Sequence, residues 1–391
     1  MSIGLGFFSG PRPHPHVVFG GRRRSRVSRS MAISSGSGKA APCFQSLDGI
    51  RSIAENGRYK VWLLDQFGVL HDGKKPYPGA ISTLESLASS GLKMIILSNS
   101  SRRASVTVEK MKTLGFDPSI FLGTITSGEL TYQYLHRSER KCHFPDYVYK
   151  LGALHPQGLE RTVNELRSGH SVLCVQHQQG KHNYPWRDDP WFAKLGRSCI
   201  HMTWSDRGAI SLEGLGLQVV ESVKDADFIL IHGTEALGLS TGDALPMDLE
   251  DLELVLEHCA DKRIPMVVAN PDFVTVEERA LRVMPGTLAA KYEKLGGEVR
   301  WMGKPDKVIY ESAIAMAGSD ASECIAVGDS LHHDIKGANA AGIESVFVTG
   351  GVHADELGLS DFGQVADAKS IEALASKHEA NPSYVVPSFS W

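Results

Sequence analysis

The sequence predicts an α/β protein whose core is a parallel sheet covered by helices on both faces. Two outer segments, about 60–125 and 300–365, alternate short apolar runs with amphipathic helical patterns. The apolar runs are continuous, which is typical of strands buried on both faces of a parallel sheet. The middle of the chain has a strand and helix pattern of its own. We therefore expect a core made of two distant halves, with a second α/β domain inserted between them.

The elements of the core follow from these patterns in order. The first half is expected to contain a helix at 44–59, a strand at 61–65, a helix at about 80–90, a strand at 94–98 and a helix at 104–114. The second half is expected to contain a strand at 324–328, a helix at about 333–341 and a strand at 345–348. In the middle, strands are expected at 199–204, 227–233 and 265–272, with an acidic amphipathic helix at 247–262.

Domain boundaries follow from the same alternation. We expect the core to comprise 46–125 and 300–375, the inserted domain to comprise 126–299, and 376–391 to form a C-terminal tail. Within the inserted domain, 139–188 shows only weak periodicity. Long segments without secondary structure are uncommon inside compact domains, so this stretch is expected to be a poorly ordered insertion.

Positive charge is concentrated at the N-terminus. No Asp or Glu precedes Asp48, whereas the same Ser- and Gly-rich stretch holds seven cations: Arg12, Arg22, Arg23, Arg24, Arg26, Arg29 and Lys39. This is the composition of an organelle transit peptide. We expect residues 1–45 to be a disordered leader for import into a chloroplast. A mitochondrial or cytoplasmic location, and a basic tail for nucleic acid, are the alternatives.

The rest of the chain is acidic and has the composition of a globular protein. Without the leader cations, 34 basic residues face 45 acidic ones, a formal charge of −11, which argues against a nucleic-acid partner. No apolar run approaches the roughly 20 residues that cross a bilayer, so no membrane association is expected. The six cysteines form no CxxC pair, which indicates neither a zinc site nor a disulfide framework.

Four polar segments end or follow predicted strands. They are Asp65 in LLDQFGVL, Ser98 and Asn99 in MIILSNSS, Lys304 in WMGKPDK, and Asp329 with Asp334 in CIAVGDSLHHD. In an open parallel sheet, ligands bind beyond the carboxyl ends of the strands. We therefore expect these side chains to share one site.

The chemistry of the four segments is complementary. A carboxylate such as Asp65 can attack phosphorus and form an aspartyl phosphate that water hydrolyses. Asp329 and Asp334 offer the hard oxygen ligands that Mg²⁺ prefers. The Ser98 hydroxyl can hold a phosphoryl oxygen, and Lys304 can neutralise charge on both the phosphate and the nucleophile.

The same residues resemble the four motifs of the haloacid-dehalogenase-like hydrolase superfamily. The resemblance is to subclass IIA, the branch with p-nitrophenylphosphatase-like and phosphoglycolate-phosphatase-like enzymes. It rests on DQFGVLHDG, LSNSSRR, GKP and GDSLHHDIKGANAAG, together with TSGE at 126–129, ANPD at 269–272 and TGGV at 349–352. It covers about 60–135 and 190–360. It implies a Rossmann-like core with a large cap, a small phosphorylated metabolite as substrate, and a possible homodimer.

The resemblance also implies roles for individual residues. Asp65 would be the nucleophile and a Mg²⁺ ligand, and Lys304 would anchor the phosphoryl group that Ser98 and Asn99 bind. Asp329 would ligate the metal, with Asp334 supporting it directly or through water. The backbone carbonyl of Phe67 would be a further metal ligand.

Three more residues can contact an anionic substrate, although each of them can also have a purely structural function. Arg102 follows the phosphate-binding turn, but it can equally be a surface charge at the start of a helix. Asn270 and Asp272 lie in ANPD, where they can position substrate or form an ordinary turn.

Phe67 departs from the pattern of the resembled family, whose phosphatases have a second Asp at this position. That Asp protonates the leaving oxygen and later activates water, and loss of such a group typically costs about 10²–10⁴ in rate. One interpretation is a phosphatase that takes its acid from His71 or Asp72, or that acts on an acyl or phenolic phosphate needing no acid. A second is a carbon–halogen hydrolase, and a third is a phosphometabolite-binding or regulatory protein.

Overall fold

The computed structural model describes residues 44–136 and 189–391, except 207 and 278–279. These residues belong to one compact unit, 42–391. Nearly all of the predicted leader, 1–45, and the whole predicted insertion, 139–188, lie outside the described residues.

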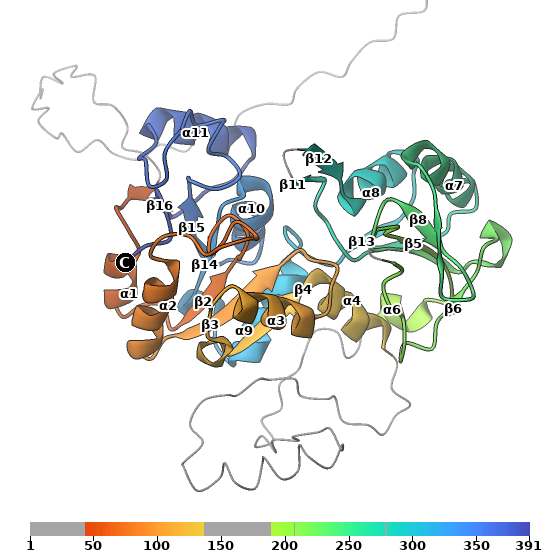
Figure 1. Cartoon of the computed structure of the whole chain (residues 1–391), viewed down its shortest axis with the longest axis horizontal. Helices are drawn as coiled ribbons and strands as arrows, with labels where there is room; N and C mark the ends of the chain where they lie inside the picture. The colour runs from red at the N-terminus through yellow and green to blue at the C-terminus, as the bar shows by residue number, and fades with distance from the viewer. Residues whose placement is uncertain (1–43, 137–188, 207, 278–279) are drawn as a thin grey trace, which may run out of the picture. The chain divides into compact units, whose positions relative to one another are not determined.

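The core is a parallel sheet of seven strands that joins the two distant halves of the sequence (Figure 1). Its order is β1 (Gln45–Ser46), β16 (Tyr384–Val386), β15 (Glu344–Val348), β14 (Cys324–Gly328), β2 (Val61–Leu64), β3 (Lys93–Ser98) and β4 (Gly123–Thr126). All neighbouring strands pair in parallel. The predicted fold class is therefore confirmed.

Strand β2 shows why its apolar run does not alternate with polar residues. Val61 and Leu63 pack into one hydrophobic cluster, whereas Trp62 and Leu64 pack into another. All four side chains are buried, so the strand is apolar on both faces. Burying one such side chain stabilises the fold by roughly 1.5–3 kcal/mol.

Helices cover both faces of the core sheet. The cluster around Trp62 includes residues of α1 (Arg51–Glu55), α2 (Ala80–Ser89) and α3 (Ala104–Thr113). The cluster around Leu63 includes residues of α4 (Ser127–Leu135), α9 (Lys307–Ala317) and α10 (Lys336–Ala340). Short turns complete the core: η1 (Pro118–Ile120), η4 (Ala321–Glu323) and the π-helical turn η5 (Leu331–Ile335). Helix α11 (Ala368–Lys377) packs on β15 and η5.

The middle of the chain forms a second, mixed sheet (Figure 1). Its order is β13 (Val299–Trp301), β10 (Met266–Val268), β7 (Phe228–Ile231), β5 (Ser198–Thr203), β8 (Ala236–Gly238) and β9 (Ala244–Pro246), with β6 (Gln218–Val219) on β5. The cap helices are α6 (Pro190–Lys194), α7 (Leu249–Asp261) and α8 (Pro285–Lys294), with the turn η3 (Val223–Asp225). A separate antiparallel pair consists of β11 (Val274–Glu277) and β12 (Ala280–Val283).

Four predicted bounds differ from the structure. The cap was expected to start at 126, but α4 packs in the cluster around Leu63 of the core sheet. The stretch 376–391, predicted as a tail, contributes β16 to the core sheet, because its apolar Val385 and Val386 are buried against neighbouring residues. The predicted core start at 300 falls inside β13, which pairs with β10 of the cap. The predicted helix at 44–59 is instead β1 followed by the short α1.

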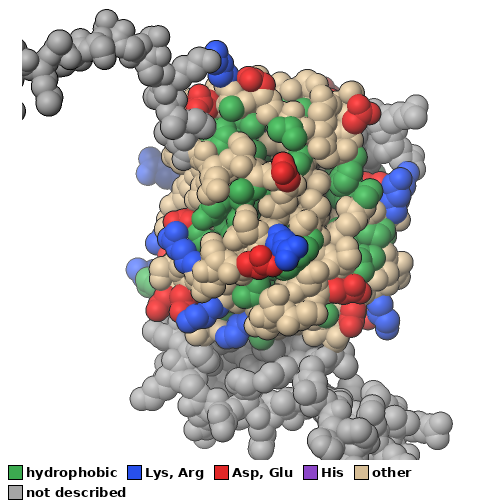
Figure 2. Space-filling model, turned by 90° about the vertical axis from the view of Figure 1, so that its left-hand side faces the viewer, with side chains coloured by type: hydrophobic (Ala, Val, Ile, Leu, Met, Phe, Trp, Pro, Cys, Tyr) green, Lys and Arg blue, Asp and Glu red, His purple; other side chains and the backbone are tan. Residues whose placement is uncertain are grey.

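One face of the molecule shows a surface of mixed character. On the face shown in Figure 2, acidic and basic side chains are interspersed among apolar ones and do not form a patch of one sign. Among the described residues, the helices are all too short or too polar to span a bilayer.

Candidate active site

Four segments converge at the carboxyl edge of the core sheet. Asp65 follows β2, Ser98 ends β3 and Asp329 follows β14, and these three strands are neighbours. The backbone N–H of Asp65 donates to the Val327 carbonyl at 2.9 Å, which extends the β2–β14 pairing up to the carboxylate. Sheet order therefore brings together polar residues that are far apart in the sequence.

Lys304 lies at the centre of this group. Its Nζ lies 2.6 Å from Oδ1 of Asp65 and 2.7 Å from Oδ1 of Asp334, and its side chain is only 4% exposed. Burial lowers the pKa of Lys304, but the Asp334 and Asp65 carboxylates outweigh burial and raise this pKa well above its usual value. Lys304 is therefore a permanent cation that touches the predicted nucleophile.

Asp65, Asp329 and Asp334 form a buried cluster of carboxylates. One oxygen of each lies within 4.8 Å of the others. Burial raises the pKa of Asp65 to about 7, and burial together with the Asp65 charge raises the pKa of Asp329 well above its usual value. One ammonium group cannot neutralise three carboxylates, so the donor set fits a divalent cation with hard oxygen ligands. Such a cation would neutralise negative charge on a bound phosphoryl group.

Glycines allow the backbone to approach Asp329 closely. A Cβ atom would lie 1.9 Å from Oδ2 of Asp329 if added to Gly68, and 2.1 Å if added to Gly351. Gly68 also has a φ of 84°, which other residues rarely adopt. The Asp329 carboxylate is held in this space by the Val352 N–H, which donates to Oδ2 at 2.7 Å. These functions of Gly68 and Val352 were not predicted from the sequence.

Ser98 and Asn99 have different environments. The Ser98 hydroxyl oxygen accepts hydrogen bonds from Nε2 of Gln66 at 2.7 Å and from the Ser100 N–H at 3.2 Å, which fixes its position at the end of β3. Oδ1 of Asn99 accepts from the Lys304 N–H at 2.8 Å, and its Nδ2 donates to the Lys304 carbonyl at 3.0 Å. Asn99 therefore holds the backbone of the lysine that contacts Asp65.

The ANPD residues form a turn that reaches the core. Oδ1 of Asn270 accepts from the Asp272 N–H at 2.9 Å, as in an Asx turn. Oδ1 of Asp272 accepts from Nδ2 of Asn99 at 2.8 Å. The next residue, Phe273, packs its ring near His332 and His333 of η5. Asp272 thus attaches the turn to the predicted phosphate site, a function that was not predicted from the sequence.

The side chain of Arg102 is exposed at the start of α3. Its neighbour Arg103 forms an ion pair with Glu129 at 2.6 Å and lies over the Tyr132 ring. Sequence position alone does not distinguish these two arginines. In the structure, Arg102 is the one whose exposure leaves it accessible to an anion.

The residues around Phe67 offer no obvious proton donor. The Phe67 side chain is 51% exposed, and its backbone pairs with His71 in an isolated bridge. His71 is buried: its Nδ1 accepts from the Gly73 N–H at 3.0 Å, and burial lowers its pKa to about 4. Oδ1 of Asp72 accepts from the N–H groups of Lys74 and Lys75, and these bonds lower the pKa of Asp72. His71 is thus neutral and Asp72 ionised near pH 7.

Comparison of the chain with known proteins identifies the family to which it is similar. Three models of haloacid-dehalogenase-like hydrolases match residues 62–166, 189–342 and 301–390. The chain is a member of the haloacid-dehalogenase-like superfamily. Among solved structures, this superfamily member is similar to a haloacid-dehalogenase-like hydrolase from Brucella suis (TM-score 0.57, 22% identity, 88% of this chain and 99% of that one). It is also similar to NagD from E. coli (TM-score 0.51, 20% identity, 85% and 97%). These likenesses concern the fold.

Curated relatives of this superfamily member are phosphatases. The D-glycerol 3-phosphate phosphatase of Mycobacterium tuberculosis is 32% identical over 37% of this chain and 38% of its own length. The ribulose-1,5-bisphosphate 5-phosphatase of Halopiger xanaduensis is 29% identical over 37% of this chain and 65% of its own length. The chain thus spans less than two thirds of the length of either relative.

Proposed function

We propose that the chain is a Mg²⁺-dependent phosphohydrolase that acts on a small phosphorylated metabolite through an aspartyl phosphate on Asp65. The observation that carries this proposal is the contact between Lys304 and two carboxylates, Asp65 and Asp334, inside a cluster that also includes Asp329. The superfamily assignment and the phosphatase activities named for the curated relatives support the same reaction class.

In the proposed reaction, a carboxylate oxygen of Asp65 attacks phosphorus and the bond from phosphorus to the leaving oxygen breaks. Water then attacks phosphorus, which releases phosphate and restores the Asp65 carboxylate. Lys304 orients Asp65 and offsets negative charge on the transferring group. Asp65, Asp329 and Asp334 would hold the Mg²⁺ together with the backbone carbonyl of Phe67.

The segment after β2 that contains Phe67, His71 and Asp72, called here the first loop, suggests which phosphate esters suit the site. Phe67 has no proton to give, His71 is buried and neutral, and Asp72 is ionised and held by backbone N–H groups. The leaving oxygen therefore departs without protonation from this loop. Acyl and phenolic phosphates, whose leaving groups are weak bases, fit this requirement better than alkyl phosphates do.

A phosphometabolite-binding or regulatory protein is the second candidate, favoured by the same lack of a proton donor in the first loop. A carbon–halogen hydrolase is less well supported, because a halide leaves without Mg²⁺ and the three-carboxylate cluster would then have no function. The named curated relatives are also phosphatases.

The test is a phosphate-release assay over a panel of acyl, phenolic and alkyl phosphates, with Mg²⁺ or with EDTA. The proposal expects Mg²⁺-dependent release by the wild type and at least about a 10³-fold loss in Asp65→Asn. Tight binding of phosphate esters without turnover would favour the binding protein. Halide release from haloacids without phosphate release would favour the hydrolase of carbon–halogen bonds.

The N-terminal leader is a separate proposal. The acid-free, Arg- and Ser-rich composition of residues 1–45 supports import into a plastid. Fusion of these residues to a fluorescent protein tests this: fluorescence in plastids supports it, and fluorescence in mitochondria or the cytoplasm contradicts it.

A further inference from the structure

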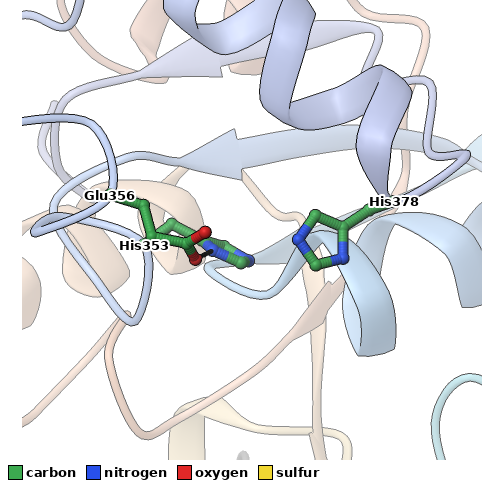
Figure 3. A group of neighbouring side chains, drawn as sticks. All are labelled: His353, Glu356 and His378. Carbon is green, nitrogen blue, oxygen red and sulfur yellow. Dashed lines mark hydrogen bonds and ion pairs between the residues drawn. The ribbon is translucent and has the colours of Figure 1, made fainter.

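Apart from the carboxylate cluster, His353, Glu356 and His378 form a second group of close titratable side chains (Figure 3). His353 and Glu356 come from the segment after β15, and His378 is the residue after the last turn of α11. Nδ1 of His353 lies 2.8 Å from Oε1 of Glu356, and the centroids of the two imidazole rings are 5.1 Å apart. Two histidines and a carboxylate are a typical donor set for a transition metal.

The hydrogen bonds of His353 argue against a metal in this group. Its Nε2 accepts from the backbone N–H of Leu331 at 3.2 Å, so this nitrogen carries no proton. In the neutral ring the proton must then be on Nδ1, which donates to Glu356. A metal on Nδ1 would displace that proton and leave an imidazolate. The other oxygen of Glu356, Oε2, already lies 3.0 Å from Nζ of Lys377.

The Leu331 N–H belongs to the backbone segment that carries Asp329 and Asp334. Leu331 begins η5, two residues after Asp329 and three before Asp334. Oδ2 of Asp334 accepts from the Ser330 N–H at 3.0 Å, so the backbone at 329–331 determines where both carboxylates lie. Val352 and His353 are consecutive: the first donates to Asp329 and the second accepts from Leu331.

We propose that His353, held in one tautomer by Glu356, is a positioning residue for the Asp329 and Asp334 carboxylates. The Glu356 carboxylate can only accept, so it keeps the proton of His353 on Nδ1 and keeps Nε2 free to accept from Leu331. The effect of His353 on catalysis rests on the proposed phosphohydrolase function. The effect of His353 on cation binding does not depend on turnover.

The experiment measures Mg²⁺ affinity by isothermal titration calorimetry on the full chain, without substrate. His353→Phe keeps a ring but removes the acceptor for Leu331, and is expected to weaken Mg²⁺ binding about 10–100-fold, as loss of groups that orient metal ligands typically does. His353→Gln can place an amide oxygen near the position of Nε2 and is expected to restore affinity to within a few fold. His378→Phe is the matched control, and its affinity is expected to equal that of the wild type.

Glu356→Ala provides a second test if His353→Phe does not fold. It is expected to weaken Mg²⁺ binding about tenfold, and nitrogen NMR of the His353 ring should show that the Nδ1–H tautomer is no longer the sole form. The proposal would be overturned if Mg²⁺ affinity were unchanged in His353→Phe. If that variant is unfolded, unchanged affinity in Glu356→Ala would overturn it. An equal loss in His378→Phe would overturn it too. Wild type that binds Mg²⁺ but releases no phosphate would contradict the proposed function and leave this inference standing.

Discussion

Nδ2 of Asn99 donates to Oδ1 of Asp272 at 2.8 Å, and this bond joins the end of β3 to the turn after β10. The same amide exchanges two hydrogen bonds with the backbone of Lys304. One side chain thus connects the second sheet to the lysine that touches Asp65. The bond accounts for the placement of two residues that were expected, from the sequence, to contact substrate.

Exchanging the amide of Asn99 and the carboxylate of Asp272 tests this connection. Asn99→Asp brings a carboxylate against Asp272 and the Lys304 carbonyl, so we expect kcat/KM for phosphate release to fall about 10²-fold. Asp272→Asn alone should cost less. The double variant should recover about tenfold, because the new amide at position 272 can then donate to the new carboxylate at position 99; coupling of this size is usual for residues in contact. Asn339→Asp is the control: Asn339 likewise exchanges two hydrogen bonds with a backbone, that of Asn381, but not with the site, so the change should have little effect on kcat/KM. Equal losses in the double variant and in Asn99→Asp would contradict the connection.

Removing Lys304 should destabilise the metal-free protein. Lys304→Met leaves Asp65 and Asp334 buried without their cation, and breaking such a pair typically costs about 3–5 kcal/mol of unfolding free energy. The loss should be smaller at pH 5 than at pH 8, because protonation relieves the buried Asp65 carboxyl group, whose pKa burial raises. Urea unfolding in EDTA at both pH values measures this.

Lys336→Met is the matched control for that experiment. Lys336 pairs with Glu379 at the surface, where such pairs are worth about 0–1 kcal/mol. A loss in Lys304→Met no greater than that of Lys336→Met would show that the buried contact does not hold the cluster together.

Cation binding should depend on pH through Asp65. In the metal-free protein the pKa of Asp65 is raised from 3.8 to about 7. A raised pKa contributes stability that is fully present below about pH 3.8 and is lost as pH rises through about 7. Mg²⁺ competes with the proton, so its stabilising effect should grow from pH 5.5 to pH 8.5. Thermal unfolding with Mg²⁺ and with EDTA measures the difference. Its pH dependence should be flatter in Asp65→Asn, where Asp329 is the remaining carboxyl group whose pKa burial raises. The same Mg²⁺-induced shift in Tm at every pH would contradict this prediction.

Much of the fold could be predicted because its signals are local. The strand at 324–328 and the apolar run before Asp65 are continuous and buried, and their carboxyl ends had to meet once both strands were assigned to one sheet. Strand β16 was missed because three residues, YVV, lie between Ser383 and Pro387 and give too short a pattern. Its burial against β15 comes from packing that the local sequence does not reveal.

The site could be predicted less completely than the fold. Asp65 and Lys304 were expected together, but the partner of Asn99 depends on how a turn more than 170 residues away docks on β3. The arrangement of His353 likewise depends on a bond to the Leu331 backbone, and a sequence pattern cannot show such a bond. The burial of His71 was also not readable, since histidine in a Gly-rich turn is usually exposed.

Replacing Phe67 by Asp should supply the proton that the first loop lacks. The Phe67 side chain is half exposed, so the change should cost little stability. We expect Phe67→Asp to raise kcat on alkyl phosphates about 10²-fold, at the low end of what a positioned acid contributes. Phe67→Asn, which has the same shape as Asp but no acidic proton, is the control and should give no such gain.

The rate of phosphate release across a series of phosphate esters with leaving groups of increasing pKa tests the central claim most directly. We predict that release by the wild type requires Mg²⁺ and Asp65 and falls steeply as the leaving-group pKa rises, and that Phe67→Asp makes this fall shallower. Equal rates on phenolic and alkyl phosphates in the wild type, with no gain in Phe67→Asp, would contradict the claim.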